Sequence, residues 1–202
     1  MTELRAVLFD LGNVVVEWEP LRLYRQRFDD LDEAKRFVSE ICTLAWHTEH
    51  DRGVPMDENA APLIAEYPQH EGHIRAWRTE WLEMFHGYVP GVPGLIAALE
   101  EARVPLFGLS NLPAEKADET FDAFPMIRVL RDVVVSGVEK VVKPDPAIYQ
   151  IALERMDMAP EHVLFIDDRA DNTTAARALG FRTHDFDGAE GLARKLQESG
   201  LL

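Results

Sequence analysis

The chain contains very little cysteine: Cys42 is the single one among 202 residues. A disulfide within the chain needs two cysteines, and a zinc site built from cysteine ligands needs several. Both are therefore excluded, and we expect the fold to be stabilised by packing alone.

Long apolar runs are also missing. No run approaches the roughly 20 residues that a helix needs to cross a bilayer. The first residues, Met-Thr-Glu-Leu-Arg, lead directly into an apolar segment without a signal-peptide pattern. We therefore expect no association with a membrane and a cytoplasmic location.

Positive charge is scarce. Lys and Arg number 21 against 36 Asp and Glu, which gives a formal net charge of −15. Such a balance opposes binding to a nucleic-acid backbone, so we expect no nucleic-acid partner. A small phosphate ligand is still compatible with this charge, because a bound divalent cation reverses the field around a cluster of carboxylates.

Hydrophobic residues make up 47% of the chain, as in an ordinary globular protein. Short buried strands are predicted at 4–9, 104–109, 132–136, 162–166 and 181–184, alternating with segments of helical spacing and followed by a last helix at 189–198. This alternation predicts an α/β fold: a Rossmann-like parallel sheet of at least five strands, flanked by helices.

Between residues 17 and 89 the alternation stops. Helices are predicted at 21–28, 31–47, 57–66 and 70–85. Turn-forming sequences, Glu19-Pro20 and the Pro-Gly-rich segment 90–94, lie at the two limits. We therefore expect a core of residues 1–16 and 90–202 with an inserted helical domain of residues 17–89.

Two patterns stand out within the insertion. Trp77, Trp81 and Phe85 recur every four residues, which indicates the packed face of one helix, with an aromatic wall for a substrate as the alternative. His47, His50 and Asp51 have a spacing that could hold a metal, but the polar turn around them favours solvated surface residues. The alternative is that one of them faces the crevice and contacts the substrate.

Three of the predicted strands end in polar residues. The first leads into Asp10, Gly12 and Asn13, the second into Ser110 and Asn111, and the third into Asp167 and Asp168. The carboxyl ends of parallel strands share one rim, and ligands bind in the crevice outside that rim. We therefore expect these side chains to lie close together.

The residue types at this rim suit phosphoryl transfer. A carboxylate can attack phosphorus when a hard cation and fixed donors relieve the repulsion between the two anions, and Mg²⁺ prefers oxygen ligands of this kind. The expected roles are a nucleophile, Asp10; magnesium ligands, Asp168 and Asp167; phosphate donors, Ser110 and Asn111; and a positive charge, Lys143. Lys143 precedes Pro144-Asp145-Pro146, which predicts a helix start whose dipole also favours an anion.

Four segments, in order along the chain, resemble the motifs of the haloacid dehalogenase-like hydrolases: Phe9–Val14, Leu109–Asn111, Lys143–Pro146 and Phe165–Asn172. The resemblance covers nearly the whole chain. It implies a magnesium-dependent phosphatase that acts on a small phosphorylated metabolite, with a sugar phosphate as the expected substrate, through an aspartyl-phosphate on Asp10.

The resemblance also implies finer assignments. The backbone carbonyl of Gly12 would contact magnesium, and Asn172 would support the site. The insertion resembles the small mobile helical cap of the subfamily I enzymes, which closes over the substrate and supplies specificity. The wording Asp-Leu-Gly-Asn-Val, together with His50-Asp51-Arg52-Gly53, is most similar to the bacterial branch that includes an α-glucose-1-phosphate phosphatase.

One position departs from the family pattern. Where family phosphatases usually carry a second Asp that protonates the leaving oxygen, this chain has Gly12. Loss of a general acid-base group typically costs a factor of about 10² to 10⁴ in rate. We therefore expect a preference for anomeric sugar phosphates, acyl phosphates or aryl phosphates over alkyl phosphates, unless another acid is recruited.

Two other functions stay open at this point. A 2-haloacid dehalogenase also uses an Asp nucleophile and lacks the second Asp, but it has no need of the carboxylates Asp167 and Asp168. A catalytically weak protein that binds phosphate ligands is the other alternative. The sequence leaves open the physiological substrate, the cap residues that contact it and the oligomeric state.

Overall fold

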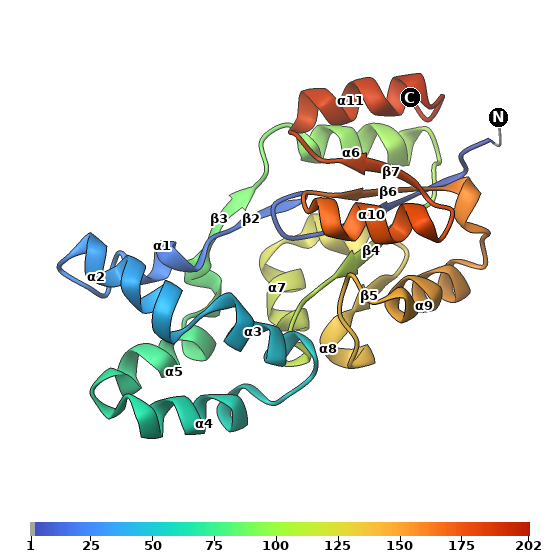
Figure 1. Cartoon of the computed structure of the whole chain (residues 1–202). Coiled ribbons are helices and arrows are strands. Elements are labelled where there is room, and N and C mark those ends of the chain that lie inside the picture. The colour runs from blue at the N-terminus through green and yellow to red at the C-terminus, as the bar shows by residue number, and fades with distance from the viewer. Residues whose placement is uncertain (1–2) are drawn as a thin grey trace.

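The computed structural model describes residues 3–202 and contains a parallel sheet of five strands. The strands, in their order across the sheet, are β5 (Val133–Val135), β4 (Leu106–Ser110), β1 (Ala6–Phe9), β6 (Val163–Asp167) and β7 (Arg182–Asp185). All four neighbouring pairs are parallel, with β1 at the centre. The predicted α/β fold with five parallel strands is confirmed (Figure 1).

Helices cover both faces of this sheet because the central strand is apolar on both sides. Val7 and Phe9 face one hydrophobic cluster, while Ala6 and Leu8 face the other, and all four are fully buried. Helices α6 (Val92–Glu101) and α11 (Ala189–Glu198) pack in the first cluster, and α9 (Pro146–Met156) and α10 (Ala170–Ala178) pack in the second (Figure 1).

The segment between β1 and α6 forms a group of helices beside the sheet, which we call the cap helices (Figure 1). They are α1 (Pro20–Tyr24), α2 (Leu31–Arg36), α3 (Leu44–Asp51), α4 (Met56–Glu66) and α5 (Glu71–Thr79). A two-stranded antiparallel ribbon, β2 (Val16–Trp18) with β3 (Phe85–Tyr88), connects them to the core. The domain limits 1–16, 17–89 and 90–202 stay a prediction.

Three of the expected helices are wrong in extent. The helix expected at 21–28 is shorter, because α1 ends at Tyr24. The helix expected at 31–47 is divided, because α2 runs into a π-helical turn at Phe37–Ile41 and Cys42 leaves helical geometry at φ −84°, ψ 63°. Thr43 then caps α3 by accepting a hydrogen bond from the Trp46 N–H. The helix expected at 70–85 is shorter, because α5 ends at Thr79 and Phe85 already belongs to β3.

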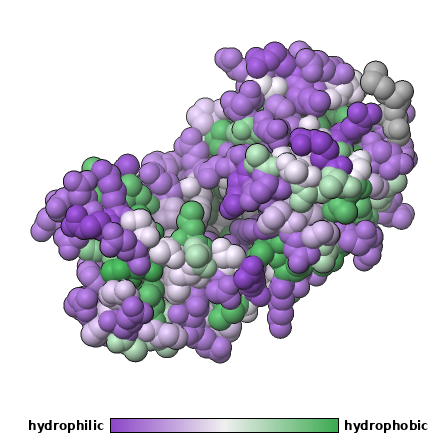
Figure 2. Space-filling model, in the orientation of Figure 1, coloured by the Kyte–Doolittle hydropathy of each residue, from purple (hydrophilic) through white to green (hydrophobic). Residues whose placement is uncertain are grey.

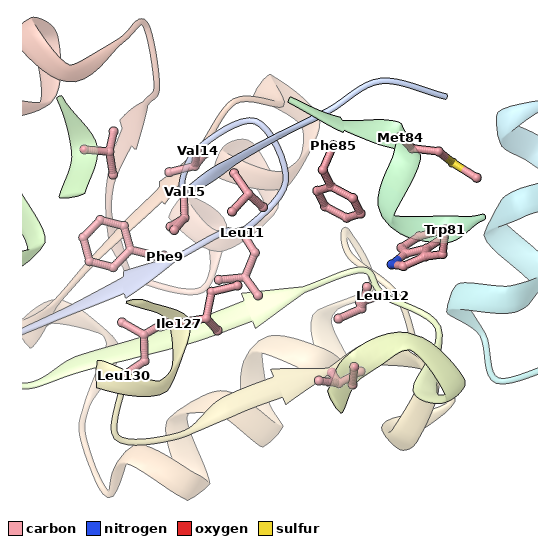
Figure 3. Close-up of a cluster of buried hydrophobic side chains, with 14 of the residues drawn as sticks. Phe9, Leu11, Val14, Val15, Trp81, Met84, Phe85, Leu112, Ile127 and Leu130 are labelled. Carbon is pink, nitrogen blue, oxygen red and sulfur yellow. The ribbon is translucent and has the colours of Figure 1, made fainter. Parts of the chain in front are cut away.

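The remaining elements are short. They are α7 (Ala117–Ala123), α8 (Ser136–Glu139) and 3-10 turns at Pro68–His70, Trp81–Met84, Ala114–Lys116, Pro125–Val129 and Pro160–His162. The turn at Trp81–Met84 packs on the core: Trp81, Met84 and Phe85 lie in one buried cluster with Leu11 and Leu112 (Figure 3). The cap helices and the sheet therefore share a continuous apolar contact.

No helix among the described residues is long and apolar enough to cross a membrane. Hydrophilic residues cover most of the face that Figure 2 shows, as the excess of acidic side chains leads one to expect.

Candidate active site

Asp10 lies directly after the central strand β1, and its side chain is held in one orientation. Oδ1 accepts a hydrogen bond from the backbone N–H of Leu11 at 2.6 Å and lies 2.8 Å from Nζ of Lys143. Oδ2 takes part in no hydrogen bond within residues 3–202. One carboxylate oxygen of a nearly buried Asp is thus fixed, and the other is available to a ligand.

Lys143 connects two of the predicted site residues. Its Nζ lies 2.8 Å from Asp10 and 2.7 Å from Asp167, and donates a third contact to the Leu109 carbonyl at 2.9 Å. Burial opposes the positive charge, but Asp10 and Asp167 outweigh it and raise the pKa of Lys143. Lys143 is therefore a charged, fully engaged ammonium at the centre of the site.

Asp167, at the end of β6, is fully buried and hydrogen-bonded at both oxygens. Oδ1 accepts from the Arg169 N–H and from Nδ2 of Asn172, while Oδ2 accepts from Lys143 and also from Asn172. These hydrogen bonds fix the orientation of Asp167, which in turn holds Lys143 in place.

Three carboxylates gather here. Oxygens of Asp10, Asp167 and Asp168 lie within 4.8 Å of one another. Burial raises the pKa of Asp10; Lys143 opposes this rise, and the two other carboxylates add to it. Burial and Asp167 likewise raise the pKa of Asp168, which is more exposed. Three acidic groups therefore surround the single ammonium of Lys143.

The end of β4 supplies the next pair. Ser110 is buried and lines the same pocket as Asp10. The Asn111 side chain braces the backbone of Lys143: Oδ1 accepts from the Lys143 N–H at 2.8 Å, and Nδ2 donates to the Lys143 carbonyl at 3.1 Å. One amide hydrogen of Asn111 remains for a ligand, and its expected contact with phosphate stays a prediction.

The helix start predicted near Lys143 is present, since α9 begins at Pro146. Its first turn is capped within the chain, because the Asp145 side chain accepts a hydrogen bond from the Ala147 N–H. Residues 144–147 do not line the pocket. The positive charge at this part of the site therefore comes from the Lys143 side chain.

A pocket of about 330 Å³ lies above these groups. Its core side includes Asp10, Gly12, Ser110, Asp168 and Asn172. Its cap side consists of Trp18, Leu44, His47, Thr48, Asp51, Trp81 and Phe85. The site therefore lies between the sheet rim and the cap helices, which is the size and place expected of a small-molecule site.

Three aromatic residues of the insertion are packed in the core, and two of them are also part of the pocket wall, so both alternatives that the sequence left open hold in part. Trp77, Trp81 and Phe85 are all buried, as a packed face requires, but they lie on α5, on the following 3-10 turn and on β3 rather than on one helix. Trp81 and Phe85 also form part of the pocket wall.

The interpretation of His47, His50 and Asp51 as solvated surface residues is wrong. All three lie on α3 and are at most 6% exposed. Trp18 and Trp77 pack against His47, with ring centroids 5.1 and 5.3 Å away, and Trp46 packs against His50 at 4.5 Å. Trp18 and Trp77 come from distant parts of the chain, so the local sequence did not indicate the burial of His47.

Glu115 ties the cap helices to the core. Its Oε1 accepts from the Met56 N–H at 2.9 Å, and its Oε2 accepts from Nε of Arg78 at 3.1 Å. Nearby, the Trp81 indole donates to Thr120 at 2.9 Å. The cap helices therefore rest on the core, and the pocket lies between the two.

The chain is similar to known hydrolases. A model of the haloacid dehalogenase-like hydrolases matches residues 4–180. A phosphorylated carbohydrates phosphatase of Thermotoga maritima is 24% identical over 178 residues, which cover 88% of this chain and 82% of that protein. An (S)-2-haloacid dehalogenase 1 of Pseudomonas sp. is 32% identical over 94 residues, or 46% of this chain and 41% of that protein.

Among solved structures, a HAD family enzyme of Bacteroides thetaiotaomicron has a TM-score of 0.76 at 18% identity, covering 96% of this chain and 99% of that one. The same enzyme in complex with magnesium and inorganic phosphate has a TM-score of 0.71 at 19% identity, covering 92% and 95%. At such identities the likeness concerns the fold.

Proposed function

The chain belongs to the haloacid dehalogenase-like hydrolases, and from this premise we propose that it is a magnesium-dependent phosphatase of a small phosphorylated metabolite. The observation that carries the proposal is the arrangement of Asp10. One of its oxygens is fixed by Lys143 and the Leu11 N–H, and the other is available at a pocket of about 330 Å³.

The donor set supports magnesium as the cofactor. Three acidic groups surround one ammonium, and Oδ1 of Asn172 is buried without a hydrogen-bond partner among residues 3–202 although the residue lines the pocket. A hard divalent cation with several bound waters suits both features. We assign Asp10, Asp168 and the backbone carbonyl of Gly12 as its ligands. Asp167, whose oxygens already accept from several donors, would mainly orient Lys143.

In the proposed reaction Asp10 is the nucleophile. Its Oδ2 attacks phosphorus, the ester oxygen departs with the bonding electrons, and water then hydrolyses the aspartyl-phosphate. Lys143 keeps Asp10 oriented and reduces its repulsion from the phosphate, while Ser110 and Asn111 donate to the phosphate oxygens. Bound magnesium would supply the further positive charge that two approaching anions require.

A sugar phosphate is the substrate class we favour. The pocket has a polar floor and an aromatic wall formed by Trp18, Trp81 and Phe85, and apolar ring faces of sugars pack on such walls while their hydroxyls need polar partners. The similarity to a phosphorylated carbohydrates phosphatase supports the same class. A cytoplasmic location and the lack of a nucleic-acid partner stay predictions from the sequence.

A 2-haloacid dehalogenase is the second candidate function, favoured by Gly12 and by the partial similarity to such an enzyme. That reaction would displace halide with Asp10 and would have no need of a cation. Asp168 beside Asp10, in a cluster of three acidic groups with the spacing of a cation site, favours the phosphatase.

The deciding experiment measures phosphate release from a panel of sugar phosphates and p-nitrophenyl phosphate, and halide release from a 2-haloacid. Wild type and Asp10→Asn are compared with magnesium and with excess chelator. We expect phosphate release that needs both magnesium and Asp10, and that is unchanged in Asp29→Asn, an exposed cap control. Halide release without magnesium, or phosphate release by Asp10→Asn at the wild-type rate, would contradict the proposal.

A further inference from the structure

The proposed phosphatase reaction needs a proton at the leaving oxygen, and the core side of the pocket does not provide one. Position 12 is glycine. Lys143 already donates to Asp10, Asp167 and the Leu109 carbonyl. Asp168 belongs to the carboxylate cluster that suits the cation. Among the acidic side chains that line the pocket, this leaves the one on the cap side.

Asp51 is the acidic group on that side. It is the last residue of α3, is 5% exposed and lines the same pocket as Asp10. Its Oδ1 is buried and has no hydrogen-bond partner among residues 3–202, although Nε2 of His47 lies 3.4 Å away. A buried carboxyl group without a partner costs free energy unless it serves a purpose.

The neighbouring histidine is a poor proton donor. The Trp77 indole N–H donates to Nδ1 of His47 at 3.2 Å, so the neutral ring carries its proton on Nε2, facing Asp51. Burial, with His50 adding to it, lowers the pKa of His47 to about 3. His47 is therefore neutral at pH 7 and does not supply the proton.

The environment of Asp51 favours its protonated form. Burial raises the pKa of this carboxyl group to about 8, and the ammonium of Lys143, reaching in from the core, opposes the rise. His47 and His50 on the same helix are both kept neutral by burial, while Asp10, Asp168 and Arg169 face the same pocket from the core. A carboxylic acid that holds its proton near neutral pH has the property that a general acid requires.

We propose that Asp51, on the cap, is the general acid-base residue that this chain uses in place of the side chain missing at Gly12. In the first step Asp10 forms a bond to phosphorus, the bond to the ester oxygen breaks, and that oxygen takes the proton of Asp51. In the second step water attacks phosphorus, the bond to Asp10 breaks, and the proton of the water returns to Asp51. Both residues end as they began.

The inference rests on the proposed function, and it ties proton transfer to the position of the cap. The acid reaches the pocket only as part of α3, so chemistry on substrates with poor leaving groups requires α3 to rest on the core. A substrate whose leaving group departs as a stable anion has no such requirement.

The test compares Asp51→Asn with wild type on p-nitrophenyl phosphate, phenyl phosphate and a hexose 6-phosphate. p-Nitrophenolate leaves readily without a proton, whereas the sugar alcohol does not. We expect kcat/KM to fall by about 10² to 10⁴ for the hexose phosphate, less for phenyl phosphate and little for p-nitrophenyl phosphate. The alkaline limb of the pH profile of kcat for the hexose phosphate should also disappear.

Gly12 offers the rescue experiment. A Cβ at this position would meet no atom within 4 Å, and the residue lines the pocket, so an Asp side chain can be accommodated. We expect the double variant Gly12→Asp, Asp51→Asn to have a kcat/KM for the hexose phosphate at least about tenfold higher than that of Asp51→Asn alone. Asp29→Asn, an exposed cap substitution, serves as the control.

The outcomes separate the two proposals. If wild type releases no phosphate from any of these substrates, the proposed function fails, and this inference with it. If wild type is active and Asp51→Asn loses the same factor on all three substrates, or loses nothing, Asp51 is not the acid and the proposed function stands. A loss that grows as the leaving group becomes poorer supports Asp51.

Discussion

Replacing Lys143 with Met tests whether its ammonium stabilises the folded protein by compensating the buried carboxylates. Met retains most of the apolar stem and removes the group that lies 2.8 Å from Asp10 and 2.7 Å from Asp167. Removal of one partner from a buried ion pair typically costs about 3–5 kcal/mol, because the remaining charge is left uncompensated. Domains are usually stable by about 5–15 kcal/mol, so a large fraction of the stability should be lost.

The assay is urea unfolding followed by tryptophan fluorescence, in chelator so that no cation replaces the lost charge. Adding Asp167→Asn to the variant should recover part of the loss, because one uncompensated carboxylate is then removed. Lys35→Met, at an exposed ion pair, should change stability little. A loss below about 1 kcal/mol for Lys143→Met would refute the reasoning.

The pH dependence of this difference has a definite sign. The folded-state pKa of Lys143 is raised, so its contribution in wild type is complete at every pH below about 10.5 and does not vary between pH 5 and 8. The pKa of folded Asp10 is already raised to about 8 in wild type, where Lys143 opposes the rise, and it should be higher still in the variant. The deficit should therefore be constant at lower pH and grow as the pH rises above about 8.

Three further predictions follow from the packing and the buried groups. Gly137→Ala should destabilise the protein by about 1–3 kcal/mol in urea, because the added Cβ would collide with backbone atoms of residues 112–114, while Gly94→Ala, where space is open, should not. Glu115→Ala should accelerate hydrogen exchange in α4 and α5, which it ties to the core; unchanged exchange would remove its assigned role. The pKa of folded His47 is about 3, so below pH 6.5 only the unfolded chain takes up this proton. The free energy of unfolding of wild type should therefore fall by up to about 1.4 kcal/mol per pH unit as the pH decreases. In His47→Gln, thermal unfolding should show a weaker dependence on pH in this range.

Much of the core could be predicted because its strands are buried on both faces. Such strands are continuous apolar runs, as in Val163–Ile166, and their ends are marked by the polar residues that form the rim. Because parallel strands share a rim, the sequence also indicated that Asp10, Ser110 and Asp167 would lie near one another, and the structure brings them together. Their chemical roles stay predictions.

The cap could be predicted less well because its structure depends on distant contacts. The helical spacing of the sequence continues through Cys42 and Thr43, yet the helix is interrupted there. The next helix, α3, lines the pocket in a new direction. Asp51 reads as part of a polar turn, and its burial depends on packing that no local pattern records. From the sequence, Gly12 indicated only that another general acid is needed; it did not point to Asp51.

The β2–β3 ribbon places the start and the end of the insertion side by side, with Glu17 paired to Gly87. The chain therefore leaves and re-enters the core at one place, although Glu115 also joins the cap helices to the core elsewhere. An insertion of another length could be joined at this ribbon without changing the order of the core strands. Because we assign the acid to the insertion and the nucleophile to the core, such an exchange would change specificity and acid-base chemistry in one step. Evolution could then alter both through a single recombination event.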